Sequence, residues 1–146
     1  MMIKERIIRW GDIQLKEMIY SADHKREVLY DGVYEGYKFA ILSLGTHPTA
    51  YVECKLEDCC SYGDERLDDV QVHGGFTYFD KSRWGEPDGI YYLGWDYSHY
   101  MDYAGWEEIY PPELRTNGRK WTTQEMFEEV KSVIEQLIKV EFKQKS

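Results

Sequence analysis

A chain of 146 residues that is 42% apolar and 16% aromatic has enough material to bury a core without disulfides or a structural metal, which excludes a disordered segment. No apolar run approaches the roughly 20 residues of a membrane-spanning helix, and the charged start MMIKERIIRWGD lacks the apolar core of a signal peptide. We therefore expect one cytoplasmic domain over residues 1–146, with no membrane association.

The net charge of −9 is unevenly distributed along the chain. Residues 53–114 contain fifteen acidic and four basic residues, and residues 84–114 contain no lysine or arginine. Such a surface repels a phosphate backbone, so we expect no direct binding to the backbone of a nucleic acid. Three interpretations remain open: the acids attract a basic partner protein, they hold a cation, or they form a solvated face that keeps the protein soluble.

Strand patterns dominate the first two thirds of the chain. Asp31-Gly32, between short apolar flanks, predicts a hairpin turn, and alternating side chains predict strands at residues 37–44 and 49–55. The polar stretch 56–69 predicts a surface loop. Strand character returns at residues 70–79, where Gly74-Gly75 predicts a bulge or a close backbone approach. After a loop at 80–89, a further strand is expected at 90–96.

The last predicted element is a helix. Thr122 and Glu125 have the spacing of a capping box, and apolar residues recur at helical spacing as far as Ile138. An amphipathic helix of about five turns must cover an apolar face, and the strands supply one. The sequence therefore predicts an α+β fold, in which an antiparallel sheet of about four to five strands is covered by a long C-terminal amphipathic helix.

One segment contains the residue types of a reactive site. In GWDYSHYMDYAG, residues 94–105, Asp96, His99 and Asp102 stand three residues apart and are expected on the same side of the chain. If strands 70–79 and 90–96 pair, His73 joins them. Two histidines with one or two carboxylates suit a divalent metal such as Zn or Mn, or proton transfer by an imidazole that a carboxylate orients.

Each of these residues also has a structural interpretation. Asp96 is well placed as the N-cap of a short helix that follows it, His73 can hydrogen-bond a bulge carbonyl, and His99 can pack among tyrosines. The spacing Asp-x-x-His-x-x-Asp is not a diagnostic metal motif. The candidate catalytic residues are His73, Asp96, His99 and Asp102. The candidate metal ligands are His73, Asp96 and His99, and His47, before the strand at 49–55, is a candidate assisting residue.

Aromatic residues crowd the same region. Eight tyrosines and tryptophans lie between residues 91 and 110, too many to bury on one short segment, so some are expected on the surface beside the acids. The alternative is that these rings belong to the rim of the core. The candidate binding residues are Gly74, Gly75, Trp95, Tyr97, Tyr103, Glu107 and Glu108.

Four segments stand in order along the chain: LGTHPTAYVE (44–53), VHGGFTY (72–78), LGWDYSHYMD (93–102) and WTTQEMFEEVKSVIEQL (121–137). Together they resemble a family of small uncharacterised proteins of bacteriophages and prophages. The matching positions are His47, His73, Gly74, Gly75, Thr77, Asp96, His99 and Asp102, whereas Tyr100 and Met101 stand where smaller residues are common. The resemblance implies a phage setting and a short accessory protein that binds and blocks host defence machinery.

Two functions are therefore carried forward. The first, which we favour, is a binding module whose acidic, tyrosine-rich region 84–114 meets a basic host protein or cups a small nucleotide-like ligand, as an inhibitor of host defence. The second is a metal-dependent hydrolase, in which His73, Asp96 and His99 hold a metal such as Zn or Mn while Asp102 orients and His47 assists. The sequence decides neither whether the protein is an enzyme nor whether it is a monomer or a homodimer.

Overall fold

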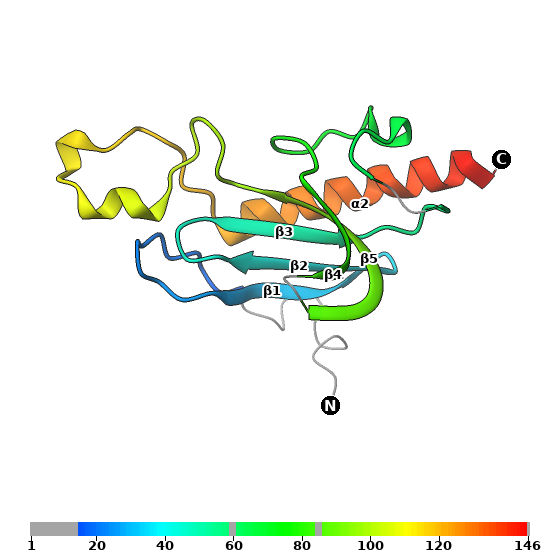
Figure 1. The fold of residues 1–146 in the computed structure, drawn as a ribbon, viewed down its shortest axis with the longest axis horizontal. Helices are drawn as coiled ribbons and strands as arrows, with labels where there is room; N and C mark the ends of the chain where they lie inside the picture. Colours follow the sequence, from blue (N-terminus) through cyan, green and yellow to red (C-terminus); the bar gives the residue numbers. More distant parts are fainter. Residues whose placement is uncertain (1–14, 59–60, 84–85, 146) are drawn as a thin grey trace.

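A five-stranded antiparallel sheet forms the body of the protein. The computed structural model describes residues 15–58, 61–83 and 86–145 (Figure 1). The strands are β1 (Glu27–Tyr34), β2 (Tyr37–Ser43), β3 (Pro48–Glu53), β4 (Tyr78–Arg83) and β5 (Glu86–Asp96), in the spatial order β1-β2-β3-β5-β4. The helix α2 (Thr123–Lys145) packs against the sheet. The predicted α+β fold, with its covering C-terminal helix, is confirmed.

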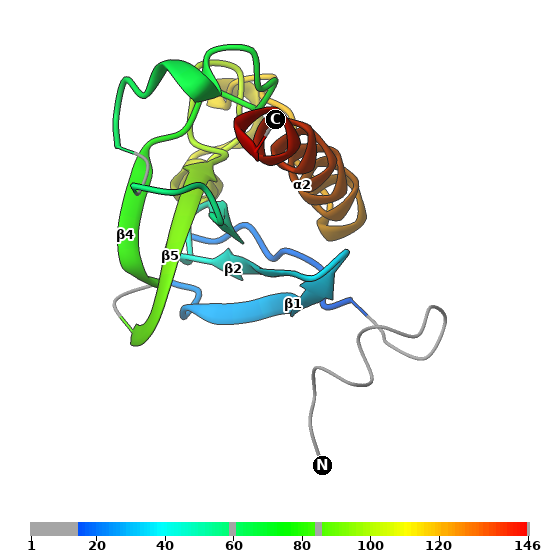
Figure 2. The ribbon, with the colours of Figure 1, turned by 90° about the vertical axis from the view of Figure 1, so that its right-hand side faces the viewer.

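The sheet is sandwiched between two layers of apolar side chains because its strands alternate. On β2, Phe39 and Ile41 belong to the main core with Phe127 and Ile134 of α2, whereas the side chains between them belong to a second cluster. That second cluster lies on the sheet face away from α2 and consists of Ala40, Leu42, Tyr51 and Tyr92, with Tyr78 and Ile90 packed against it. Figure 2 shows α2 lying across one side of the strongly curved sheet.

The first hairpin turn lies four residues later than the sequence predicts. Asp31 and Gly32 are paired inside the β1–β2 ladder, opposite Ala40 and Phe39, and the turn is formed by Glu35 and Gly36. Both turn residues have positive φ, 51° and 82°, which suits the tight two-residue turn of a hairpin. The prediction at Asp31-Gly32 is wrong because the paired apolar residues of β1 and β2 fix the register, not the local dipeptide.

The predicted strand at 70–79 is also displaced. Gly74 and Gly75 have φ values of +69° and +80°, which end any extended run, and Gly75 N–H donates to the Val72 carbonyl in a turn. Residues 70–77 are therefore not a strand. The strand β4 begins at Tyr78, opposite Gly94, and continues into the stretch that was predicted as a loop.

A lobe formed by residues 97–121 connects β5 to α2 and projects beyond the end of the sheet, where it is drawn in yellow at the left of Figure 1. It contains two short 3₁₀ helices, η2 (Gly105–Ile109) and η3 (Pro112–Leu114); a third, η1 (Glu65–Leu67), lies in the loop after β3. The predicted capping box is present at the start of α2, where Glu125 N–H donates to Thr122 Oγ1 at 3.1 Å and Thr122 N–H donates to Glu125 Oε1 at 2.9 Å. Among the described residues, no helix is both long enough and apolar enough to cross a membrane.

Candidate functional site

Asp102 is the centre of a polar cluster at the base of the lobe. Its Oδ2 accepts hydrogen bonds from His73 Nε2 at 2.7 Å and from the His99 backbone N–H at 2.9 Å, and its Oδ1 accepts one from Trp121 Nε1 at 2.9 Å. The side chain is only 3% exposed. Burial raises the pKa of this carboxyl, but the three hydrogen bonds outweigh burial and hold the pKa below its ordinary value. Asp102 is therefore an ionised tie between the lobe and the body.

A tight turn brings Asp102 into this position. Asp102 N–H donates to the His99 carbonyl at 2.9 Å, and Met101, one residue earlier, has a φ of +78°. Arg119 N–H donates to the Met101 carbonyl at 2.7 Å, which fastens the start of the lobe to the segment that leads back to α2. A left-handed backbone is costly for a residue other than glycine, and this bond helps to stabilise it. The sequence gives no sign of this turn.

His73 is held from three sides. Its backbone N–H donates to Glu129 Oε2 on α2 at 2.7 Å, and its ring stacks on Tyr97, with the ring centroids 4.8 Å apart and the planes 14° from parallel. Trp121 meets the same ring edge-on at 4.9 Å. Tyr97 is itself fixed, since its hydroxyl donates to Glu129 and accepts from Trp95 Nε1. The imidazole is thus oriented by packing and by Asp102 together.

His99 lies directly over Gly74, the first residue of the glycine pair. A Cβ atom added at Gly74 would stand 2.1 Å from His99 Nε2, whereas one added at Gly75 would meet nothing within 4 Å. The close approach predicted for the glycines is thus real at Gly74. His99 Nε2 is 3.3 Å from Asp96 Oδ1, but the two atoms are poorly aligned, and this buried nitrogen has no hydrogen-bond partner among the described residues. Asp96 instead accepts the Ser98 N–H at 3.0 Å, so it caps a turn, and the short helix expected after it does not form at residues 97–102.

His47 completes the cluster from the β2–β3 turn. Its Nδ1 is 3.1 Å from Thr46 Oγ1. Burial lowers the pKa of His47, and His99 lowers it further, although Asp96 and Asp102 oppose the shift. The rings of His73 and His99 are 5.5 Å apart. Three of the four histidines of the chain therefore gather at one end of the sheet, a convergence that the sequence could not establish.

The geometry offers no ligand set for the predicted metal centre. Within residues 15–58, 61–83 and 86–145, no three histidine, cysteine, aspartate or glutamate side chains are grouped so that they could hold a metal ion. One reason is that His73 Nε2 and both oxygens of Asp102 are engaged with each other and with the lobe. The arrangement favours a structural clasp, and the metal-dependent hydrolase remains a prediction without support from the geometry.

Several of the predicted binding residues are buried. Trp95 and Tyr97 are fully buried in the core, and Tyr103 and Glu107 are only 4% and 3% exposed. They are not available to a partner, because Glu107 accepts hydrogen bonds from Thr116 N–H and Oγ1 at 2.6 and 2.8 Å and Tyr103 donates to Glu108. Glu108 in turn lies 3.7 Å from Arg115 and 3.8 Å from Lys120.

The exposed apolar side chains of the lobe are different ones. Tyr100 and Met101, next to Asp102 in the chain, are 93% and 61% exposed. Trp106, Ile109, Tyr110 and Leu114 are 50%, 68%, 44% and 69% exposed, and we call these last four residues the apolar patch. The rings of Trp106 and Tyr110 meet edge-on at 6.1 Å. Sequence reasoning counted the aromatic pair but missed Ile109 and Leu114. The Pro111-Pro112 pair between them, which marks a rigid surface turn, is the feature that could have indicated them.

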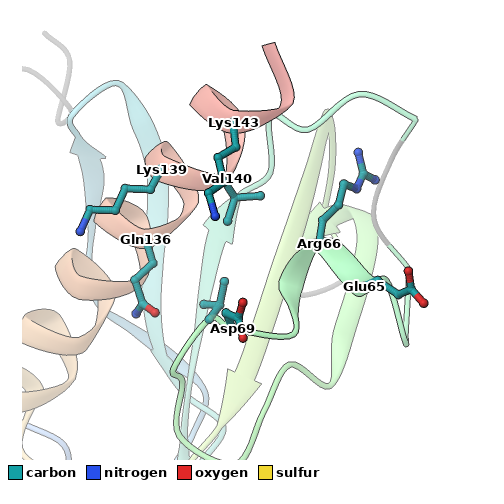
Figure 3. Close-up of a pocket in the computed structure, with 8 residues that line it drawn as sticks. Glu65, Arg66, Asp69, Gln136, Lys139, Val140 and Lys143 are labelled. Atoms are coloured by element: carbon teal, nitrogen blue, oxygen red, sulfur yellow. The ribbon is translucent and has the colours of Figure 1, made fainter. Parts of the chain in front are cut away.

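A groove of about 610 Å³ lies between residues 65–70 and the C-terminal half of α2, at the opposite end of the helix from the lobe (Figures 1 and 3). Val70 and Val140 contribute its apolar wall. Two of its polar side chains already hold the loop. Gln136 bonds the backbone N–H and carbonyl of Gln71 at 2.7 and 3.0 Å, and Arg66 bonds Asp64. This groove holds none of the residues that the sequence singled out.

Comparison with known proteins assigns no function to this site. No family model, no curated protein and no solved structure matches the chain. The resemblance to phage proteins therefore remains a prediction.

Proposed function

We propose that the protein is a protein-binding module and that the apolar patch on the lobe is its contact surface. The observation that carries this proposal is the exposure of four large apolar side chains within nine residues, Trp106 to Leu114, in a chain whose core is otherwise well filled. Tryptophan and tyrosine are the residues most enriched among the energetically dominant contacts of interfaces. Large exposed apolar clusters on a single-chain surface mark sites of interaction.

The patch is also held rigidly, which lowers the entropic cost of binding. Gly105 N–H donates to the Thr46 carbonyl at 2.6 Å, and a Cβ atom at Gly105 would stand 2.3 Å from the Ser21 backbone nitrogen. Only glycine therefore allows η2 to seat this closely on the body. The buried Glu107 carboxylate ties η2 to Thr116, and Arg115 Nε donates to the Tyr110 carbonyl at 2.8 Å. These contacts fix the backbone beneath the patch.

The partner that suits this surface is a protein with an apolar pocket. The local acidity expected from the sequence contributes little to affinity, because Glu107 is buried and Glu108 lies beside Arg115 and Lys120. The net charge of −9 still favours a basic partner through faster encounter. If the phage resemblance holds, a protein of the host is the natural candidate, and inhibition of its activity is the expected result. A small nucleotide-like ligand is disfavoured, because the four residues of the patch are aromatic or aliphatic and none of them carries a positive charge for a phosphate.

The test is a capture experiment followed by a binding measurement with the purified partner. A photoreactive amino acid at Glu113, beside Leu114, is cross-linked in an extract of the cell that carries the gene. The captured protein is then titrated by calorimetry against the wild-type chain and against Trp106→Ala and Ile109→Ala. We expect each patch variant to weaken binding by about tenfold or more. Raising the salt concentration from about 50 to about 500 mM should lower the association rate constant and leave the dissociation rate constant little changed.

Phe142 provides a matched control, since it is 74% exposed on the far part of α2 and lies outside the lobe. Phe142→Ala should bind the partner within about twofold of the wild type. An equal loss of affinity in Phe142→Ala and Trp106→Ala would show nonspecific adhesion and overturn the proposal. A partner that binds Trp106→Ala as tightly as the wild type would overturn it as well.

A further inference from the structure

Three aromatic rings and two carboxylates line a small cavity between the loop after β3 and the start of β4. The cavity has a volume of about 130 Å³, and its lining includes Tyr62, Phe76 and Phe79 together with Asp64 and Asp68. We call these five residues the aromatic cage, and none of them belongs to the lobe. Pockets for drug-sized ligands measure about 300 to 1,000 Å³. A cavity of this size therefore suits a single small chemical group.

The three rings meet at steep angles and do not stack. The centroid of Phe79 is 6.1 Å from that of Tyr62 and 6.4 Å from that of Phe76, and the ring planes are inclined at 76° and 66°. A cation is attracted to the face of an aromatic ring within about 6 Å of its centroid. Among the described residues, no lysine or arginine stands over any of these three rings. The faces that line the cavity are therefore open to a cation from outside.

The fold holds two of the rings in place before any ligand binds. Phe79 is paired opposite Leu93 on β5, and the ring of Phe76 meets the fully buried Trp95 at 6.0 Å with the planes inclined at 70°. Tyr62 is 81% exposed and forms the outer wall. Side chains that are already ordered lose little conformational entropy on binding, which favours affinity for even a small group.

The two carboxylates differ in what they already bind. Both oxygens of Asp64 accept hydrogen bonds from the Arg66 guanidinium, at 3.0 and 2.7 Å, so these two charges offset each other. The Asp68 side chain has no hydrogen-bond or ion-pair partner among the described residues. Asp68 therefore gives the cavity its uncompensated negative charge. This charge and the negative faces of the rings both favour a cation.

The number of acceptors decides which cation fits best. A primary ammonium has three N–H donors and a guanidinium has five, and each donor needs an acceptor when it leaves water. Only one of the two carboxylates of the aromatic cage is uncommitted. A quaternary ammonium has a full positive charge and no N–H group, so rings and a single carboxylate satisfy it.

We propose that the aromatic cage binds a quaternary ammonium group. A small molecule such as choline and a trimethylated lysine of another protein carry the same trimethylammonium head, and the experiment below distinguishes these two sources. The site is separate from the apolar patch and does not depend on the function proposed for that patch.

Tetramethylammonium chloride is the first probe. It is titrated into the full chain at constant ionic strength, while NMR follows the ring resonances of ¹³C-labelled phenylalanine and tyrosine. We expect saturable shifts at Tyr62, Phe76 and Phe79. Ammonium chloride should bind at least about fivefold more weakly, as should the uncharged analogue of choline in which carbon replaces nitrogen when it is compared with choline itself.

Variants of Tyr62 separate attraction to the ring face from simple apolar contact. Tyr62→Phe keeps the ring and should bind tetramethylammonium within about twofold of the wild type, whereas Tyr62→Leu should bind at least about fivefold more weakly. Because Tyr62 is 81% exposed, neither change disturbs the core. Tyr100→Leu is the matched control, since Tyr100 is 93% exposed on the lobe and its loss should have no effect.

The carboxylates supply a second comparison. Asp68→Asn should weaken binding more than Asp69→Asn, because Asp69 lines the groove beside α2 and not the aromatic cage. Tighter binding of choline than of a trimethyllysine peptide would identify a small-molecule ligand. The reverse order, with the unmodified lysine peptide at least about fivefold weaker, would identify a methylated protein. Either order supports the proposal.

Three results would overturn the proposal: no saturable shift at Phe79, equal binding of choline and its uncharged analogue, or equal losses in Tyr62→Leu and Tyr100→Leu. Trp106→Ala should bind tetramethylammonium as the wild type does, because Trp106 belongs to the apolar patch. Failure of the aromatic cage is thus separate from failure of the capture experiment.

Discussion

Asp102 is the residue on which the base of the lobe depends most. Three donors converge on its carboxylate, and its side chain is almost fully buried. In Asp102→Asn, an amide N–H₂ replaces one acceptor oxygen and must face a donor that has no other partner. We expect the free energy of unfolding to fall by about 2 to 4 kcal/mol, as for a buried charge pair or hydrogen-bond set that loses one member. Urea denaturation at pH 7 measures it.

The control for this prediction is Asp69→Asn. Asp69 is exposed at the rim of the groove beside α2, so the same chemical change should alter the free energy of unfolding by less than about 0.5 kcal/mol. The wild type should also lose the contribution of Asp102 only below pH 3.8, since the pKa of this group is lowered on folding. Equal effects of the two substitutions would contradict the central role given to Asp102.

The adjacent glycines make an internal comparison possible. Both have positive φ, so alanine at either position pays for a left-handed backbone, a cost of about 1 to 2 kcal/mol. Only Gly74→Ala also places a Cβ atom 2.1 Å from His99 Nε2. We expect Gly74→Ala to be more destabilising than Gly75→Ala by at least about 1 kcal/mol. Urea midpoints give the difference, and the His99 ring resonances should shift only in Gly74→Ala. Identical midpoints would mean that His99 does not rest on Gly74.

The elements differ in how far their own sequence determines them. The helix α2 was predictable, because the Thr122–Glu125 capping box and the apolar stripe are local features that tertiary contacts merely complete. The hairpin turn was not, because Asp31-Gly32 has the right local chemistry but lies inside a ladder whose register is set by distant pairing. Likewise, the strand β4 begins only after the turn at Gly74-Gly75. Gly74 leaves room in this turn for the His99 ring, which comes from a distant part of the chain.

The residue types of the candidate site could be predicted from the sequence, but the exposure of their side chains could not. Asp96, His99 and Asp102 are three apart in the sequence, and His73 does meet Asp102. The joining of His47 and the burial of Glu107 depend on how the lobe folds back on the β2–β3 turn, a contact between residues 46 and 105. Residue type alone suggested that the tyrosines and glutamates would face solvent. The lobe instead buries Tyr103 and Glu107 to support four other side chains.

The whole molecule is expected to be a monomer at neutral pH. Stable interfaces bury about 800 Å² on each partner and involve about 20 to 30 residues a side, whereas the apolar patch has four large side chains. The net charge of −9 adds repulsion between identical copies. Sedimentation velocity at about 50 μM should therefore give one species with the mass of a single 17.4 kDa chain. Screening this repulsion with about 0.5 M salt should still give a monomer, because the patch is too small by itself. A dimer that persists in Trp106→Ala would place self-association elsewhere on the surface, whereas a dimer lost in that variant would make a second copy of the chain the occupant of the patch.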